Sequence, residues 1–364
     1  MPTRDLGLIG GEPIITLKRD LSGGNAPAFV GAEVLPGRGM MLLQVSAHLP
    51  ARGPFNILTA PPVERAREIL SGGPDDFAGN QSFSMGAAIL VPYANRIRGR
   101  RSNVERCVET EILGKPVILP ANGGGKTRSA EVYAIHGLIL ADRVTQFTRR
   151  GTDQQDAVTA KFQAGDFGGH WLSSTDLAFE MALRNDSLSL TVTATNVGSE
   201  ILPIGIGWHP YFALPSGRRE QVRLHVPGRR RVAVNNYDEV LPTGELLAVA
   251  GTPYDFSSPA GAPLGNLYLD DCYVDLDKTA EGHTVAAIID PEAGYGLRIV
   301  AASSEISAIQ TYAPPERAFV VVEPQFNWAD PFGSQWPPGT PTGMVKLKPK
   351  QSVTYAVKLE LFTP

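Results

Sequence analysis

The stretch Leu177–Leu183 (LAFEMAL), the turn residues 184–186 (RND) and the stretch Leu188–Thr195 (LSLTVTAT) decide the fold of this chain. In LSLTVTAT, large apolar side chains alternate with small or polar ones. Alternation of this kind places every second side chain on one face of a β-strand. Asn and Asp between two such runs favour a tight turn. The stretch therefore predicts a β-hairpin and, with it, an antiparallel sheet.

Runs of the same type recur throughout the chain, and turn signals rich in Gly, Asn, Asp and Pro separate them. The further predicted strands are Met40–Ser46, Val222–Val226, Val232–Asn235, Val285–Ile289, Leu297–Ala301, Phe319–Val322 and Val353–Leu361. One short helix is expected over Pro61–Leu70, because proline lies near its start and Ser71-Gly72-Gly73 follows it. This pattern predicts an all-β fold, an antiparallel sandwich or barrel with few short helices. We expect a single domain over residues 1–364, since all-β domains reach this size.

Composition narrows the class of protein. Hydrophobic residues make up 43%, and the 38 glycines and 30 prolines indicate many turns between short strands. A net charge of −4 gives no reason to expect nucleic-acid or membrane partners. No apolar run approaches the about 20 residues that span a bilayer, and residues 1–6 lack the apolar core of a signal peptide, so a cytoplasmic protein is expected. Cys107 and Cys272 are expected to be free, buried thiols, with one bridge left open.

An uncharged segment, Gly205–Phe212 (GIGWHPYF), holds His209 between glycines and aromatic residues. Pro210 biases His209 towards an extended conformation, and the glycines permit close backbone approach. A histidine held in this way is a candidate proton donor near neutral pH. A hydrogen-bonded histidine of the core would give the same pattern.

The segment Phe319–Trp328 (FVVVEPQFNW) places Glu323 at the end of an apolar strand, before a proline. A carboxylate in this position is partly desolvated, which raises its pKa and makes it a better general base. The alternative is a salt bridge at the strand end.

The segment Val91–Arg100 (VPYANRIRGR) places Asn95 and Arg96 among apolar residues. Their paired donors and acceptors suit the vicinal hydroxyls of a sugar. The alternative is a basic surface turn, which is favoured for Arg98 and Arg100.

His136 lies in another apolar setting and is followed by Gly137, so it is either a functional or a core histidine. Asp270 and Asp271 are adjacent, and in an extended chain they point to opposite faces. We expect Asp270 to face the site; the alternative is an acidic loop.

The sequence lacks the motifs of metal, nucleotide-binding and serine-nucleophile sites. No cluster has metal-ligand spacing, and neither a Gly-x-Ser-x-Gly elbow nor a dinucleotide fingerprint occurs, so no metal or cofactor is expected. Residues 122–127 (NGGGKT) read as a flexible loop, because Pro120 replaces the first glycine of a phosphate-binding loop. His48, His170, His225 and His283 receive no role.

The polar segments occur in a definite order: Asn-Arg-Ile, His-Gly, Gly-x-His-Pro-Tyr-Phe, Asp-x-x-Tyr and Glu-Pro-Gln. In this order, over roughly residues 85–330, they resemble the aldose 1-epimerase (galactose mutarotase) family. The resemblance implies a large antiparallel β-sandwich and a cofactor-free interconversion of the α and β anomers of a free aldose.

The resemblance also implies roles for individual residues. Glu323 matches the general base that takes the proton of the anomeric hydroxyl, and His209 matches the general acid that protonates the ring oxygen. The sugar-binding positions that it implies are Asn95, Arg96, His136 and Asp270. Trp208, Tyr211, Phe212 and Trp328 stack on the sugar or belong to the core.

Two segments, 61–80 and 325–336, look particular to this chain and leave the identity of the sugar open. One alternative is a hexose-6-phosphate 1-epimerase, for which Arg98, Arg100 and Arg101 would supply the phosphate contacts. A second is a non-catalytic carbohydrate-binding protein on the same scaffold. A polysaccharide lyase or glycosidase would need a second catalytic carboxylate, and no partner for Glu323 stands out.

Overall fold

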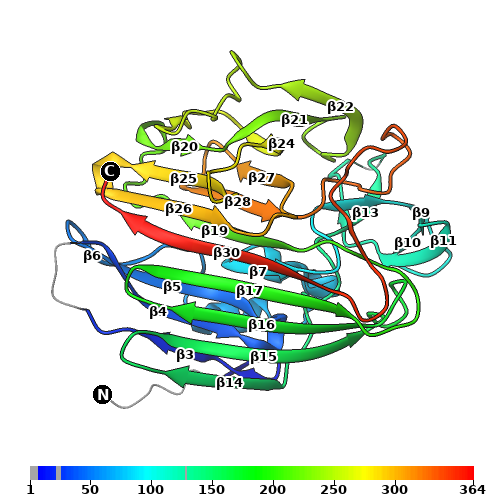
Figure 1. Cartoon of the computed structure of the whole chain (residues 1–364), viewed down its shortest axis with the longest axis horizontal. Helices are drawn as coiled ribbons and strands as arrows, with labels where there is room; N and C mark the ends of the chain where they lie inside the picture. Colours follow the sequence, from blue (N-terminus) through cyan, green and yellow to red (C-terminus); the bar gives the residue numbers. More distant parts are fainter. Residues whose placement is uncertain (1–6, 22–25, 128) are drawn as a thin grey trace.

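Two large antiparallel sheets dominate the structure (Figure 1). The computed structural model describes residues 7–21, 26–127 and 129–364, so the N-terminal hexapeptide used for the localisation prediction lies outside it. The first sheet has nine strands, in the spatial order β14 (Gln146–Gly151), β15 (Asp156–Gly165), β16 (Thr175–Leu183), β17 (Ser187–Asn196), β30 (Ser352–Phe362), β26 (Tyr295–Ala301), β25 (Thr284–Asp290), β20 (Arg223–His225) and β23 (Ala262–Pro263).

The second sheet has eleven strands and carries the residues of greatest interest. Its spatial order is β22 (Pro242–Ala248), β21 (Gly228–Val234), β24 (Leu269–Leu276), β27 (Ala308–Ala313), β28 (Phe319–Gln325), β19 (Gly207–Ala213), β7 (Ala87–Leu90), β5 (Met41–Leu49), β4 (Ala28–Leu35) and β3 (Ile15–Lys18), with β6 (Gly53–Asn56) paired to β5.

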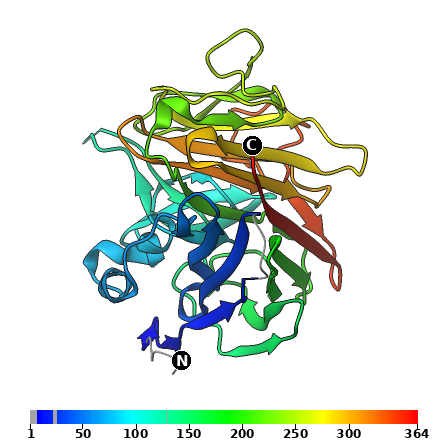
Figure 2. The ribbon, with the colours of Figure 1, turned by 90° about the vertical axis from the view of Figure 1, so that its left-hand side faces the viewer.

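Smaller elements surround these sheets. The small sheets are β1 (Leu8–Ile9) with β2 (Glu12–Pro13); β9 (Arg100–Arg101), β10 (Cys107–Ile112) and β11 (Lys115–Pro120); β8 (Arg96–Arg98), β12 (Gly123–Gly124) and β13 (Val132–Ile135); and β18 (Leu202–Ile204) with β29 (Val345–Leu347). The helices are α1 (Val63–Ile69) and the 3₁₀ segments η1 (Pro36–Arg38), η2 (Pro74–Phe83, which is kinked), η3 (Arg219–Gln221) and η4 (Pro291–Ala293). Figure 2 shows the coils around α1 and η2 projecting at one side.

The predicted hairpin forms β16 and β17, with Leu183 opposite Leu188. Along β17 the side chains alternate without a break between buried and half-buried positions. The inward-facing set, which includes Leu190 and Val192, packs in the main core. The prediction of an antiparallel all-β fold is confirmed. Most strands extend beyond the predicted limits by up to four residues at an end, whereas β20 is one residue shorter than predicted at each end.

The main core joins side chains from both large sheets. Val192 and Tyr355 enter it from the nine-stranded sheet, and Trp208, Val320 and Val322 enter it from the eleven-stranded sheet. Because side chains alternate along a strand, the neighbours of these residues, His209 and Glu323, point away from this core. They lie on the outer face of the eleven-stranded sheet.

Three local predictions were wrong in detail. Gly123 and Gly124 form a short strand opposite Tyr133 and Val132 rather than a flexible loop. A Cβ on Gly123 would lie 2.3 Å from the Tyr133 ring, so only glycine lets the two segments pair this closely. Cys107 is half-buried rather than buried, although both cysteines are free as predicted.

The predicted helix is shorter than expected and begins at Val63, after both prolines. In the described part of the chain, no helix is both long enough and apolar enough to cross a membrane.

Candidate active site

Strand pairing brings His209, Glu323, Gln310 and Asp270 to one place on the outer face. The strands β24, β27, β28 and β19 are consecutive neighbours in the sheet. Gln310 lies directly opposite Glu323 on the adjacent strand. His209 lies between the pairs Gly207–Gln325 and Tyr211–Val321, which also sets it beside Glu323. Residues far apart in the sequence therefore share one polar patch, which we call the site.

Glu323 and His209 form the centre of the site. Glu323 Oε2 lies 3.7 Å from His209 Nε2, and both side chains are buried. Neither carboxylate oxygen of Glu323 has a hydrogen-bond partner, and neither does His209 Nδ1. The strand β28 continues through Glu323 to Gln325, so Glu323 lies within the strand rather than at its end, and it is fully buried rather than partly desolvated.

Burial sets the protonation of this pair. It raises the pKa of the Glu323 carboxyl well above its ordinary value; Arg96 opposes this effect and Asp270 adds to it. Burial also lowers the pKa of His209 to about 4, and the charge of Arg96 contributes to this. At neutral pH both directions favour uncharged groups, with the proton of the pair on Glu323.

Asn95 reaches the site from the end of the connection between β7 and β8, and Arg96 reaches it from the first position of β8. Asn327 braces this connection: its Oδ1 accepts from the Ala94 amide at 3.0 Å and its Nδ2 donates to the Ala94 carbonyl at 2.8 Å. A Cβ on Gly205 would lie 2.0 Å from Asn327 Oδ1, and a Cβ on Gly207 would lie 2.8 Å from the Ala94 Cβ. The two glycines before His209 therefore permit the close approach of this connection to β19.

His136 directly follows β13, and its backbone adopts a φ of 63°. Its amide donates to the Asn95 carbonyl at 2.9 Å. Its ring contacts the His209 ring edge-on, with centroids 4.9 Å apart. Burial lowers the pKa of His136 well below its ordinary value, and His209 and Arg96 act in the same direction. A neutral imidazole with an unpartnered Nδ1 therefore lies beside the catalytic candidates.

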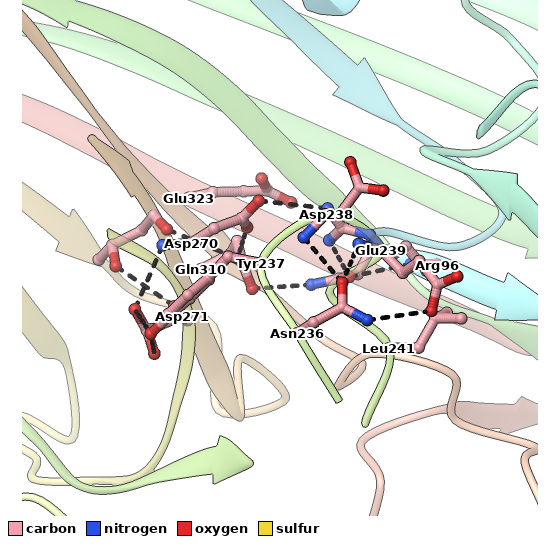
Figure 3. Close-up of polar contacts among 12 residues, drawn as sticks. Arg96, Asn236, Tyr237, Asp238, Glu239, Leu241, Asp270, Asp271, Gln310 and Glu323 are labelled. Atoms are coloured by element: carbon pink, nitrogen blue, oxygen red, sulfur yellow. Dashed lines mark hydrogen bonds and ion pairs between the residues drawn. The ribbon is translucent and has the colours of Figure 1, made fainter. Parts of the chain in front are cut away.

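The polar side chains of Asn95, Arg96, Asp270 and Gln310 form a closed ring of hydrogen bonds, and Figure 3 labels Arg96, Asp270 and Gln310 together with Glu323. Asn95 Nδ2 donates to Gln310 Oε1 at 2.9 Å, and Gln310 Nε2 donates to Asp270 Oδ1 at 2.6 Å. Arg96 closes the ring by donating to Asp270 Oδ2 at 3.3 Å and to Asn95 Oδ1 at 3.2 Å. Such a network holds the amides and the guanidinium in fixed orientations.

The two adjacent aspartates separate as alternation predicts. Asp270 joins the hydrogen-bonded ring, whereas Asp271 pairs with Arg231 at 2.6 Å and accepts from the Tyr237 hydroxyl at 3.0 Å. All six predicted site residues, Asn95, Arg96, His136, His209, Asp270 and Glu323, lie in one cluster. Gln310 and Asn327 were missed, although a lone amide within the apolar strand AIQTYA was a signal for Gln310.

The four candidate aromatic residues divide into two groups. Trp208 and Phe212 point into the main core, and Trp328 packs against Trp336. Tyr211 alone lies on the outer face, with its ring 5.0 Å from the His209 ring. Only Tyr211 of the four therefore contacts His209 by its ring.

Of the two segments that looked particular to this chain, 325–336 reaches the site, whereas 61–80 ends just before Phe83, which does. Phe83, at the end of η2, contacts the His136 ring at 4.8 Å and accepts a hydrogen bond from the Tyr211 hydroxyl. Asp330 donates its amide to the Arg96 carbonyl at 2.6 Å. Phe83 and Asp330 therefore shape the surroundings of the sugar-binding candidates.

The basic residues proposed for a phosphate are already engaged or remote. Arg98 forms ion pairs with Glu131 and Asp330 and donates to the Pro242 carbonyl. Arg100 and Arg101 are exposed on β9, outside the cluster. Within the described ranges, no group of three or more His, Cys, Asp or Glu side chains has the arrangement of a metal site.

Comparison with known families agrees with this geometry. A family model described as aldose 1-epimerase matches residues 58–360. The chain belongs to the aldose 1-epimerase family. The match spans the whole site, from the connection that carries Asn95 to Glu323.

Individual relatives of the aldose 1-epimerase family are distant. The uncharacterized protein YphB of Escherichia coli is 31% identical over 115 residues, which cover 32% of this chain and 34% of that protein. The chain thus matches about a third of the length of this curated relative.

Solved structures show the same fold over nearly the full length. A galactose mutarotase-like protein from Clostridium acetobutylicum has a TM-score of 0.73 and 18% identity, with 96% of this chain and 99% of that chain covered. A galactose 1-epimerase from Lactobacillus acidophilus has a TM-score of 0.62 and 17% identity, with 96% and 98% covered. The galactose mutarotase-like fold implied by the sequence is confirmed.

Proposed function

We propose that this protein is a mutarotase that interconverts the α and β anomers of a free aldose by acid/base ring opening and closure. The observation that carries this proposal is the Glu323–His209 pair: an acid and a base 3.7 Å apart, buried and otherwise unpartnered. Buried polar groups without partners are rare in folded proteins and are frequent at functional sites.

In the proposed reaction, ionised Glu323 takes the proton of the anomeric hydroxyl while protonated His209 donates a proton to the ring oxygen. The C1–O5 bond breaks and the open-chain aldehyde forms. Rotation about C1–C2 presents the other face of the carbonyl. The ring then closes with both proton transfers reversed, and each positioned transfer contributes about 10²–10⁴-fold to the rate. Both groups regain their starting state, so this chemistry uses no cofactor.

The pair holds one proton throughout this cycle. Glu323 carries it when His209 is neutral, and His209 carries it when Glu323 is ionised. The burial effects on both pKa values favour the first state in the free protein. The state with the proton on Glu323 is the one that closes the sugar ring. To open a ring, the proton must first move from Glu323 to His209, which lies 3.7 Å away.

The surrounding polar groups suit a sugar held at this pair. Arg96 Nε and His136 Nδ1 are buried and unpartnered, and both lie near His209 and Glu323. We assign them to the ring-oxygen side of the sugar, and we assign Asn95 and Asp270 to its hydroxyls. The closed hydrogen-bonded ring keeps these groups in position before the sugar binds.

Two observations weigh against the alternatives. A phosphate-binding epimerase would need free cations, but Arg98 is neutralised by two carboxylates and Arg96 is paired with Asp270. A binding protein without turnover has no use for a buried acid–base pair in which the Glu323 oxygens and His209 Nδ1 lack hydrogen-bond partners.

Polarimetry of freshly dissolved α-D-glucose, α-D-galactose and several pentoses tests the proposal. Faster approach to the anomeric equilibrium for any of these sugars, above the rate without protein, is the expected result. If no free sugar responds while a hexose 6-phosphate does, the phosphate epimerase replaces the mutarotase. If neither responds, the protein is not a mutarotase.

A further inference from the structure

A row of aromatic side chains extends from His209 across the outer face of the eleven-stranded sheet. We call it the aromatic shelf; its members are Tyr211, Phe319, Tyr312, Tyr268 and Tyr237. Successive ring centroids lie 5.0 Å apart for Tyr211–Phe319, 5.9 Å for Phe319–Tyr312, 6.3 Å for Tyr312–Tyr268 and 5.2 Å for Tyr268–Tyr237. These spacings fall within the range of direct aromatic contact. The row is therefore continuous from the site to its far end.

Strand register explains why the shelf shares a face with the site. Tyr211 lies two residues after His209, and Tyr312 lies two residues after Gln310, so each pair points to the same side. Tyr268 lies two residues before Asp270, and Phe319 lies four residues before Glu323. The shelf therefore begins next to the polar cluster and crosses the neighbouring strands β19, β28 and β27 to the start of β24.

Exposure separates the shelf from the core aromatics. Trp208 and Phe212 are fully buried, whereas Tyr211, Phe319, Tyr312 and Tyr268 are half-buried and Tyr237 is 37% exposed. Among the described residues, the hydroxyls of Tyr268 and Tyr312 have no hydrogen-bond partner, while Tyr237 is anchored to Asp271 (Figure 3). The shelf thus offers apolar ring surface together with free hydroxyl groups.

The charges near the shelf favour an uncharged ligand. The carboxylates of Asp270 and Glu316 act on both Tyr268 and Tyr312, and guanidinium groups oppose them, Arg96 at Tyr268 and Arg317 at Tyr312. Around these two rings together, two carboxylates therefore face two guanidinium groups. Partly exposed aromatic rings beside a few polar groups are typical of surfaces that bind neutral sugars by stacking and hydrogen bonds.

From this geometry we propose that the aromatic shelf binds the second and further units of a neutral oligosaccharide whose reducing-end sugar occupies the site. This inference rests on the proposed mutarotase function and specifies its substrate class. The ring contact between Tyr211 and His209 makes the shelf continuous with the site. Contacts to non-reacting parts of a substrate raise kcat/KM when they are made in the transition state.

The test compares sugars with the same reacting ring. Glucose, maltose, maltotriose, cellobiose and cellotriose all present a reducing-end glucose, so the chemistry at the anomeric carbon is matched. We expect kcat/KM for anomer exchange to rise about tenfold from glucose to the better trisaccharide, which corresponds to one or two aromatic contacts. Equal values for all five sugars would overturn the proposal.

Substitutions on the shelf test whether its rings cause the preference for trisaccharides. Tyr268→Ala and Tyr312→Ala should lower the trisaccharide-to-glucose ratio of kcat/KM to near one, and Tyr312→Phe, which keeps the ring, should retain most of it. Phe147→Ala is the matched control, because Phe147 is a half-buried aromatic on β14 in the other sheet. A ratio that stays high in both alanine variants, or that falls equally in Phe147→Ala, would overturn the assignment.

Calorimetric binding separates this inference from the proposed function. If no sugar is mutarotated but maltotriose or cellotriose binds more tightly than glucose in a Tyr268-dependent way, the shelf stands and the mutarotase function fails. If glucose is mutarotated and no trisaccharide gains affinity or rate, the function stands and the shelf proposal fails.

Discussion

The nine-stranded sheet and the centre of the eleven-stranded sheet treat polar side chains in opposite ways. In β17 and β30, threonine and serine side chains face outward and pair with one another, as in the Thr193–Thr354 and Thr195–Ser352 hydrogen bonds, and the buried Asn196 is bonded to the Leu347 carbonyl. In β19 and β28, polar groups occupy buried positions, and Glu323 has no partner for either oxygen.

This difference shows which sheet serves stability and which accommodates a site. Burying a polar group without a partner destabilises a fold by about 1–3 kcal/mol, so a sequence selected only for stability would replace it. In the nine-stranded sheet, buried polar side chains such as Asn196 have hydrogen-bond partners, and the buried hydroxyl of Tyr295 is the exception among its described residues. The outer face of the eleven-stranded sheet breaks this rule where the proposed chemistry needs an acid and a base.

Among the variants, Glu323→Gln should have the largest effect on anomer exchange. We expect anomer exchange to slow by about 10³-fold, because the amide cannot accept the anomeric proton. The free energy of unfolding should not fall, since the buried Glu323 must take up a proton to become neutral, whereas the amide is neutral without one. Polarimetry and denaturant titration measure the two effects. The control is Glu180→Gln on β16, which is exposed and should change neither quantity.

His209→Asn should slow anomer exchange by at least about 10²-fold, because the ring oxygen loses its proton donor. The rate constant from polarimetry provides the readout. A rate near that of the unmodified protein would refute the role of His209 as general acid.

In the pH profile of kcat/KM, the histidine should control the acidic limb and the carboxyl group the alkaline limb, the reverse of the order that their ordinary pKa values would give. The pair works only with one proton, so kcat/KM should fall about tenfold per pH unit below about pH 4, where His209 takes up a second proton. It should also fall at alkaline pH, where Glu323, with its raised pKa, loses its proton. If kcat/KM instead rises through the ordinary pKa of a glutamate and stays constant at all higher pH values, this scheme is contradicted.

Gln310→Met should affect stability more than rate. The substitution leaves Asn95 and Asp270 without their hydrogen bonds to Gln310, and we expect a loss of about 1–3 kcal/mol in unfolding free energy together with a higher KM. Thr193→Val, which removes an exposed pair in the other sheet, should cost about 0.5 kcal/mol or less. Comparable losses for the two variants would remove the contrast between the sheets.

Local sequence patterns predicted most of the strands because alternation and turn residues act over short distances. β17 follows from LSLTVTAT alone, whereas β28 reads as a continuous apolar run because both of its faces are covered. The true extent of β28, through Pro324 to Gln325, depends on its pairing with β19 and β27 and was not predictable.

The site was predictable in its residue types but not in its connections. The six candidate residues were identified from motifs, yet Gln310 was missed because its importance arises from lying opposite Glu323 on a neighbouring strand. Phe83 was missed for the same reason, since η2 reaches His136 only through tertiary packing. A single sequence does not state which strands are neighbours, and those contacts complete the site.

A double-mutant cycle on anomer exchange tests the central claim most directly. Rate constants would be measured by polarimetry, on one responsive sugar, for the unmodified protein, Glu323→Gln, His209→Asn and the double variant. If the two residues act as one proton-sharing pair, the double variant should be no slower than the slower single variant. Multiplicative losses in the double variant, or a near-normal rate in either single variant, would contradict the shared-proton mechanism.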